Sequence, residues 1–108
     1  MDEIVKWTLA ALDDLEQITE YIGRDSQFYA AALVQEVFSA SDSVGRLPLA
    51  GSIVPEFNDE SIREVFVRKY RMIYRAHDDR VFVLAFVHGA RDLPKAWEDS
   101  GRREIDPS

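Results

Sequence analysis

The feature that most limits the fold is a set of three apolar segments joined by short links. The segments span about 62–67, 70–76 and 81–88, and they are rich in the β-branched and aromatic residues typical of strands. The links, 68–69 and 77–80, are too short to carry the chain across a sheet, so consecutive strands must run antiparallel. The sequence therefore predicts three neighbouring antiparallel strands.

The third segment differs from the other two. Residues 81–87 are apolar at every position, which predicts a central strand that is buried on both faces. Residues 4–9 alternate in polarity, so they can form a short first strand that pairs with it.

Two amphipathic helices are expected between the first strand and the other three. Apolar residues recur every three or four positions from Ala11 to Ile22, after a capping residue at Thr8, and this helix should end near Gly23. A second helix, capped by Asp25 or Ser26, should stop before Pro48. The short link makes the two helices an antiparallel hairpin.

These elements define the fold class and the domain. Residues 47–59 form a turn-rich connector with one short extended piece at 52–54. The sequence thus predicts an α+β fold of order β-α-α-β-β-β, with a helical hairpin packed on a small, mainly antiparallel sheet. A single domain is expected over residues 1–98, with a flexible C-terminal tail at 99–108.

Charge is distributed unevenly along the 108 residues. The net charge is −7, but residues 1–60 carry 3 basic and 12 acidic side chains, whereas residues 61–97 carry 8 basic and 4 acidic ones. The overall acidity argues against direct binding of nucleic acid. The arginines of the predicted strands indicate a surface that meets an anionic partner. The acidic residues of the first helix, which include Asp13 and Asp14, are assigned to its solvated face.

Several classes of protein receive no support from the sequence. The chain has no cysteine, no His or Asp cluster with metal-ligand spacing and no glycine-rich phosphate loop, so neither a metal nor another cofactor is expected. Nothing at its start is typical of a signal peptide, and no apolar run is long enough to cross a membrane. A cytoplasmic protein without membrane contact is therefore expected.

The chain resembles the RelE/ParE toxin superfamily of type II toxin–antitoxin systems. The resemblance covers about ninety residues and combines the element order with scattered residues rather than one decisive motif. The matching positions are Trp7-Thr8, Ala11, Asp14-Leu15, Ile18, Tyr21-Ile22, Leu47-Pro48, Gly51, Pro55-Glu56, Arg63-Glu64, Tyr70-Arg71, Ile73-Tyr74, His88 and Arg91-Asp92-Leu93.

This resemblance implies a growth-inhibiting toxin of a plasmid-stabilisation module. Such a toxin is held silent by a cognate antitoxin protein, and it meets DNA only through that antitoxin. RelE-like members cut messenger RNA at the ribosome, whereas ParE-like members inhibit DNA gyrase. Two functions with different chemistry are thus implied.

The resemblance also points to the candidate site residues. RNA cleavage needs clustered cations and a proton-transfer group, and Arg63, Arg71, Arg91 and His88 would be catalytic if the RelE-like alternative holds. Trp97 lies near the position of a base-stacking tyrosine in that pattern. A plainer interpretation makes His88 a strand-end residue whose ring bonds the backbone, and makes the arginines the solvated face of the sheet.

The sequence favours a ParE-like toxin that acts by binding, with gyrase as its target. Arg63, Arg71, Arg91 and Trp97, with an apolar groove between helices and sheet, are then the expected antitoxin-binding or target-binding residues. Two alternatives stay open. One is a metal-independent, ribosome-dependent endoribonuclease, and the other is an inactive antitoxin-binding domain.

Overall fold

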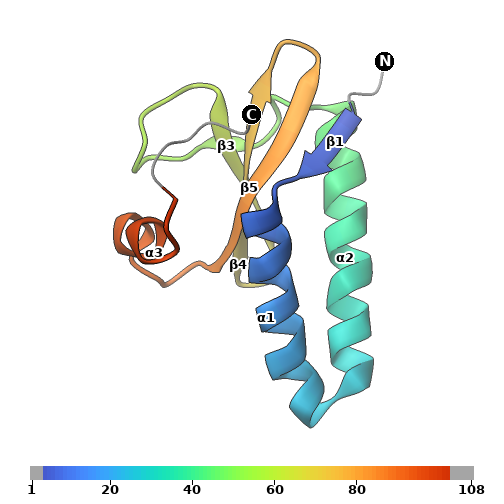
Figure 1. Cartoon of the computed structure of the whole chain (residues 1–108). Coiled ribbons are helices and arrows are strands. Elements are labelled where there is room, and N and C mark those ends of the chain that lie inside the picture. Colours follow the sequence, from blue (N-terminus) through green and yellow to red (C-terminus); the bar gives the residue numbers. More distant parts are fainter. Residues whose placement is uncertain (1–3, 103–108) are drawn as a thin grey trace.

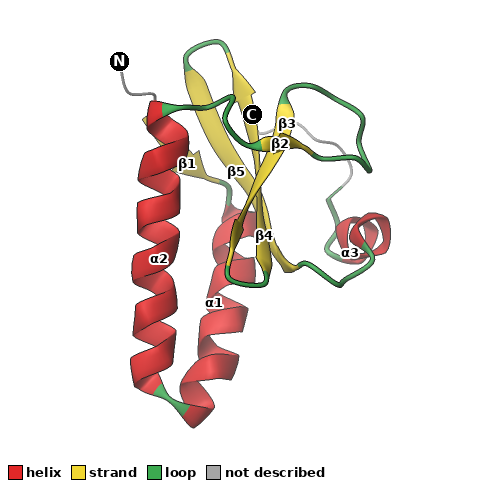
Figure 2. Cartoon of the chain, turned by 180° about the vertical axis from the view of Figure 1, so that it is seen from behind, coloured by secondary structure: helices red, strands yellow, loops and turns green. Residues whose placement is uncertain are grey.

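The computed structural model describes residues 4–102, which form a five-stranded sheet and three helices (Figures 1 and 2). The elements in chain order are β1 (Ile4–Trp7), α1 (Leu9–Asp25), α2 (Gln27–Arg46), β2 (Ser52–Ile53), β3 (Ile62–Val67), β4 (Tyr70–His77), β5 (Arg80–His88) and α3 (Leu93–Asp99).

The sheet has the order β1-β5-β4-β3-β2. β1 is parallel to β5, and every other neighbouring pair is antiparallel. β5 was predicted to be the central strand; it is an interior strand, but the middle position belongs to β4. The prediction that the first strand pairs with β5 is confirmed. The α+β fold class is confirmed as well.

Two side chains set the limits of the helical hairpin. The Thr8 hydroxyl accepts a hydrogen bond from the amide of Ala11 at 3.1 Å and starts α1. The amide of Ser26 donates the last hydrogen bond of α1, to the Ile22 carbonyl at 3.0 Å. The Ser26 hydroxyl then caps α2 by accepting from the amide of Tyr29 at 3.2 Å. A one-residue link forces the two helices to run antiparallel, and Figure 2 shows them side by side against the sheet.

The first core layer lies between the hairpin and the sheet. Leu33 and Val37 of α2 pack there against Met72, Tyr74 and Phe86, and all five side chains are buried. Burial of such side chains stabilises the fold by about 1.5–3 kcal/mol each.

A second core layer covers the opposite face of the sheet. Ile73 of β4 and Leu84 of β5 pack there against Val54 of the connector and against Leu93 and Trp97 of α3. The sheet is therefore covered on both faces.

The helix α3 was not predicted from the sequence. The carboxylate of Asp92 caps it by accepting from the amide of Lys95 at 3.1 Å, and Pro94 lies in its first turn. The predicted tail needs a correction, because α3 continues to Asp99 and Arg102 bonds to the body of the domain. The other residues of that tail, 103–108, lie outside the described part of the chain.

β5 contains a bulge at its centre. Tyr74 pairs with Val83, but the preceding residue Ile73 pairs with Ala85, so Leu84 is the extra residue. A bulge changes the direction of the backbone groups that follow it.

Candidate functional site

Arg71 lies in the second core layer, where two carboxylates neutralise it. Its two terminal nitrogens donate to the two oxygens of Glu56 at 2.9 Å each, and its Nε donates to Glu64. The Arg71 residue is only 6% exposed, so the solvated-face interpretation is wrong for this position. The hydrogen bonds that Arg71 donates to Glu56 and Glu64 raise the pKa of Arg71 despite its burial, with those to Glu56 as the largest cause.

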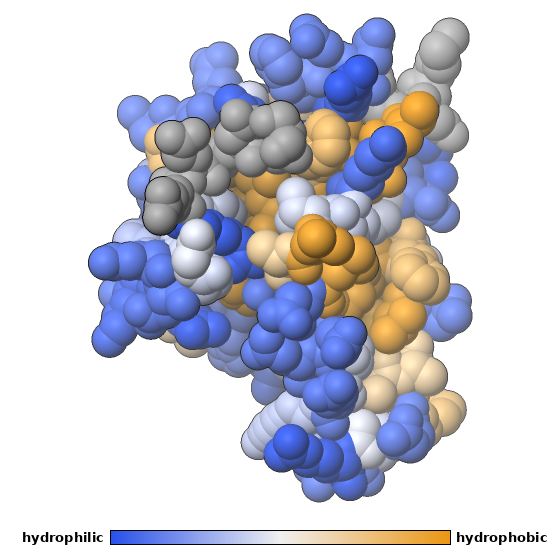
Figure 3. Space-filling model, viewed as in Figure 1, coloured by the Kyte–Doolittle hydropathy of each residue, from blue (hydrophilic) through white to orange (hydrophobic). Residues whose placement is uncertain are grey.

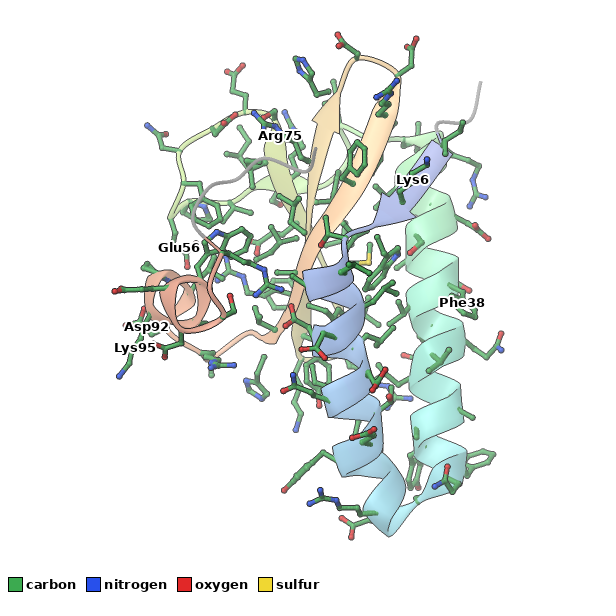
Figure 4. The ribbon with its side chains drawn as sticks, viewed as in Figure 1. Lys6, Phe38, Glu56, Arg75, Asp92 and Lys95 are labelled. Carbon is green, nitrogen blue, oxygen red and sulfur yellow. The ribbon has the colours of Figure 1, made fainter. Side chains whose placement is uncertain are left out.

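Glu56 belongs to the site because it pairs with Arg71, and the sequence did not predict this pairing. It comes from the connector on the side of the sheet that carries α3 (Figure 4). The hydrogen bonds from Arg71 lower the pKa of its carboxyl below the usual value. No local pattern marks Glu56, because it meets Arg71 only through the folding of the connector.

Arg63 lies on the opposite face of the sheet from Arg71. Side chains two residues apart in a strand lie on the same face. Arg63 therefore shares its face with Val65 and Val67, which belong to the hairpin-side layer. Arg71 shares its face with Ile73, which belongs to the other layer. The predicted Arg63–Arg71–Arg91 region is therefore wrong as a single surface.

The guanidinium of Arg63 is used to hold the connector. It donates to the main-chain oxygens of Leu49 at 3.1 Å, Gly51 at 3.0 Å and Glu60 at 3.0 Å. The neighbouring Tyr74 hydroxyl donates to the Pro48 carbonyl at 2.6 Å. Backbone carbonyls therefore engage the Nε and Nη1 groups of Arg63.

His88 and Arg91 lie at the end of β5. The Nδ1 of His88 accepts a hydrogen bond from the amide of Ala90 at 3.1 Å, and its ring lies edge-on to Tyr70. This is the backbone contact expected of a strand-end histidine. The Arg91 residue is exposed and lines a polar cavity together with Asp13 and Asp14 of α1.

Trp97 is part of the core rather than an open stacking surface. It is 7% exposed, and its ring packs edge-on against Phe57 with centroids 5.0 Å apart. The guanidinium of Arg102 lies over the same ring, 5.2 Å from the centroid. A base could therefore reach Trp97 only after α3 or the connector moved.

An apolar groove of about 230 Å³ runs between the C-terminal part of α2, the connector and β3. Leu47, which is 66% exposed, stands at its border, and the β3 residue Phe66 also lines it. The remaining lining residues are Ala40, Ser43, Val44, Ala50, Gly51 and Val65. Ile4 of β1 and Leu9 and Leu12 of α1 are exposed as well, and Figure 3 shows apolar side chains at several places on this face of the molecule. Exposed apolar surface of this kind is typical of protein-binding sites.

The family model described as the ParE toxin of the type II toxin–antitoxin system parDE matches residues 5–93. The chain belongs to the ParE toxin family. The match runs from β1 to the first residue of α3. The Arg71–Glu56 ion pair and the apolar groove lie inside the matched range, and Arg102 lies outside it.

Relatives of this ParE-family toxin agree with the assignment. Toxin RelE2 of Caulobacter vibrioides is 33% identical over 88 residues, which are 81% of this chain and 96% of that protein. In the chromosomal ParDE system of P. aeruginosa, a solved chain with 18% identity gives a TM-score of 0.65 over 80% of this chain and 95% of its own length. The RelBE2 toxin–antitoxin complex of Mycobacterium tuberculosis gives 0.57, with 23% identity, over 82% of this chain and 99% of the matched chain. The two structures show the same fold.

Residues 4–102 of this ParE-family chain contain neither a metal-ligand cluster nor a membrane-spanning helix. No three His, Asp or Glu side chains come together there as metal ligands would. None of the helices in this range has the length and apolar character needed to span a bilayer.

Proposed function

We propose that this ParE-family toxin acts by binding, that DNA gyrase is its target, and that a cognate antitoxin neutralises it in the cytoplasm. The observation that carries the proposal is the neutralisation of Arg71 by Glu56 and Glu64. Two carboxylates already compensate the charge of Arg71 and take three of its five N–H donors, which leaves it poorly suited to bind a phosphate.

Phosphoryl transfer would need a different arrangement of these side chains. Cleavage through a 2′-hydroxyl requires cations at the developing phosphorane and groups that move protons. Arg63 and Arg71 lie on opposite faces of the sheet, and the His88 ring accepts from a backbone amide. This separation supports inhibition by binding over RNA cleavage.

The apolar groove beside Leu47 is the surface that we assign to the antitoxin. A groove between a helix and a sheet, lined mainly by apolar residues and with the exposed Leu47 at its border, suits the apolar face of an amphipathic helix. The titles of the two similar structures describe toxin–antitoxin systems, which supports an antitoxin partner. Arg91, which is exposed, remains a candidate for polar contacts with the antitoxin or the target.

The test is induction of this chain alone in a bacterial host, with labelled thymidine and leucine followed over the first minutes. Early loss of thymidine incorporation is expected, and purified protein should inhibit supercoiling by gyrase. The antitoxin is the control: its co-expression should restore thymidine incorporation, and its addition to the purified assay should restore supercoiling. Early loss of leucine incorporation would instead indicate a ribosome-dependent nuclease. No loss of either, with the antitoxin still bound, would indicate an inactive binding domain.

A further inference from the structure

Two arginines lie at the border of the apolar groove between α2, the connector and β3. Arg46 is exposed in the last turn of α2, and its Nη2 donates at 3.4 Å to the hydroxyl of Ser43, which lines the groove. Arg63 of β3 lies on the same face as the lining residue Val65, two positions along the strand. Its Nη1 donates at 3.0 Å to the carbonyl of Gly51, which also lines the groove.

Neither of these two arginines has an anionic partner within the described part of the chain. No carboxylate of residues 4–102 lies within ion-pair distance of either guanidinium. The main-chain carbonyls that Arg63 binds are neutral acceptors and leave its charge uncompensated. The border of the groove is therefore cationic at two points.

Other arginines of the chain are compensated inside the fold. They pair with carboxylates from distant segments: Arg68 with Glu36, Arg71 with Glu56 and Glu64, and Arg102 with Asp14. Asp14 also accepts from the amide of Phe86, so it is not on the solvated helix face to which the sequence assigns it. Against this pattern, the charges of Arg46 and Arg63 are left for a partner.

The groove has the anatomy of a small protein-binding site. Ser43 contributes a polar side chain to its lining, and the other lining residues are apolar. An apolar centre with a polar or charged border is the usual arrangement at protein–protein interfaces. Apolar side chains of a partner fit the centre, and cations at the border favour carboxylates opposite them.

Nucleic acid is a poorer occupant of this groove than an acidic protein segment. A phosphate backbone could meet the two arginines, but it would leave the apolar lining without a partner. The net charge of −7 also repels a polyanion over the rest of the surface. Apolar lining and cationic border together therefore favour a polypeptide that carries both apolar and acidic side chains.

We propose that the antitoxin segment seated in this groove is acidic and amphipathic, and that its carboxylates pair with Arg46 and Arg63. Arg63 is held in place by the connector, so its ion pair fixes the position of the bound segment. Arg46 is exposed, so it attracts the acidic segment during approach. This inference rests on the proposed function, because it states the chemistry of the same antitoxin at the same groove.

Association kinetics of the full chain with its cognate antitoxin test the inference through Arg46, because Arg63 cannot be removed without releasing the connector. R46E should slow association roughly three- to tenfold at about 0.15 M salt and should change dissociation less, since charges at a border act mainly on approach. The difference between R46E and the wild type should shrink at about 1 M salt, where the Debye length falls to about 3 Å.

The matched control is R24E. Arg24 is likewise exposed in the last turn of a helix, and its substitution changes the net charge by the same amount. It lies near the link between the two helices, at the end of the hairpin far from the connector (Figure 2). R24E should therefore slow association much less than R46E does. Equal slowing by both variants would show an effect of net charge alone and contradict the inference.

Stability measurements separate the proposed contact from a local role of Arg46. A cation in the last turn of a helix interacts favourably with the helix dipole. If that were the whole role of Arg46, R46E would lower the urea midpoint and leave the association rate unchanged, which would overturn the inference. Faster association of R46E would overturn it as well, because the bound segment would then be basic at that point.

Gyrase inhibition and oligomeric state distinguish the other occupants of the groove. Without antitoxin, R46E should inhibit supercoiling as the wild type does, and a loss of inhibition would assign the groove to the target instead. A wild-type dimer in sedimentation that R46E converts to a monomer would assign it to a second copy. Equal binding of antitoxin to R46E and wild type would overturn the inference and leave the proposed function standing, whereas failure of the antitoxin to bind the wild type would overturn both.

Discussion

Arg71 of β4 and Glu56 of the connector face each other through two parallel hydrogen bonds of 2.9 Å each. This pair joins a loop to the middle of the sheet, and Glu64 completes it from the neighbouring strand β3. A buried arginine is stable only with such partners, because its desolvation is otherwise uncompensated. An arginine that resembles a catalytic group in sequence therefore serves as a structural link.

Replacing Glu64 by glutamine should lower the free energy of unfolding by roughly 1–3 kcal/mol, because the buried Arg71 loses one charged partner. Urea denaturation at pH 7 measures the change. Glu36→Gln, which alters the exposed ion pair with Arg68, is the matched control and should have a much smaller effect. Equal losses in the two variants would show that burial of Arg71 is not what matters.

The contribution of Glu56 should depend on pH. Its pKa is lowered from 4.5 by the hydrogen bonds from Arg71, so the ionised form stabilises the folded state. The difference in unfolding free energy between the wild type and E56Q should be fully present well above pH 4.5 and should shrink as the pH falls through the lowered pKa. Urea titrations between pH 7 and pH 3 test this. A difference that stayed constant over the whole range would contradict the assignment.

The hydroxyl of Tyr74 should matter although it lies in the core. It donates to the Pro48 carbonyl at 2.6 Å and accepts from the Gly51 amide at 3.2 Å. Tyr74→Phe leaves both backbone groups without this partner, and we expect a loss of about 1–3 kcal/mol in thermal or urea unfolding. Tyr21→Phe, at an exposed position, is the control and should be neutral.

Substitutions of Trp97 should distinguish packing from hydrogen bonding. Its Nε1 is buried and has no hydrogen-bond partner within residues 4–102. Trp97→Phe keeps most of the contact with Phe57 and removes that unpaired group, so the loss should be under about 1.5 kcal/mol. Trp97→Ala should cost about 3–5 kcal/mol. Similar losses in both variants would mean that the indole nitrogen is satisfied in solution.

Leu47 should contribute to antitoxin binding without contributing much to the fold. The side chain is exposed at the border of the apolar groove, so Leu47→Ala should change thermal stability little and weaken antitoxin affinity by on the order of tenfold or more. Calorimetric titration with the antitoxin measures this. Phe28→Ala, at an exposed position at the start of α2, is the control for the loss of an exposed apolar side chain. Equal affinities for the two variants would place the antitoxin elsewhere.

Strand and helix positions were largely predictable because their signals are local. Thr8 and Ser26 cap the helices as expected, and β3 coincides with its predicted range of 62–67. The helix α3 was missed because it is only seven residues long and its apolar side chains show their role only against the sheet.

The candidate site was less predictable because its side chains are paired across the fold. Strand periodicity puts Arg71 on the same face as Ile73, but it could not show that Glu56 and the connector would cover that face. Arg63 carries the same charge and lies on the hairpin side, where it binds main-chain carbonyls. Two arginines of similar sequence context thus have different partners, carboxylates for Arg71 and main-chain carbonyls for Arg63.

The sequence by itself determined the elements, their order and the family, since capping, periodicity and strand composition act between residues a few positions apart. The tertiary structure decided which charges are used and which remain accessible. Asp14 meets Phe86 and Arg102, which are 72 and 88 residues away in the chain, and Arg71 meets Glu56 only because the connector returns over β4. Such contacts depend on the geometry of the whole sheet, because burial and electrostatic pairing are set by all the elements that surround a group.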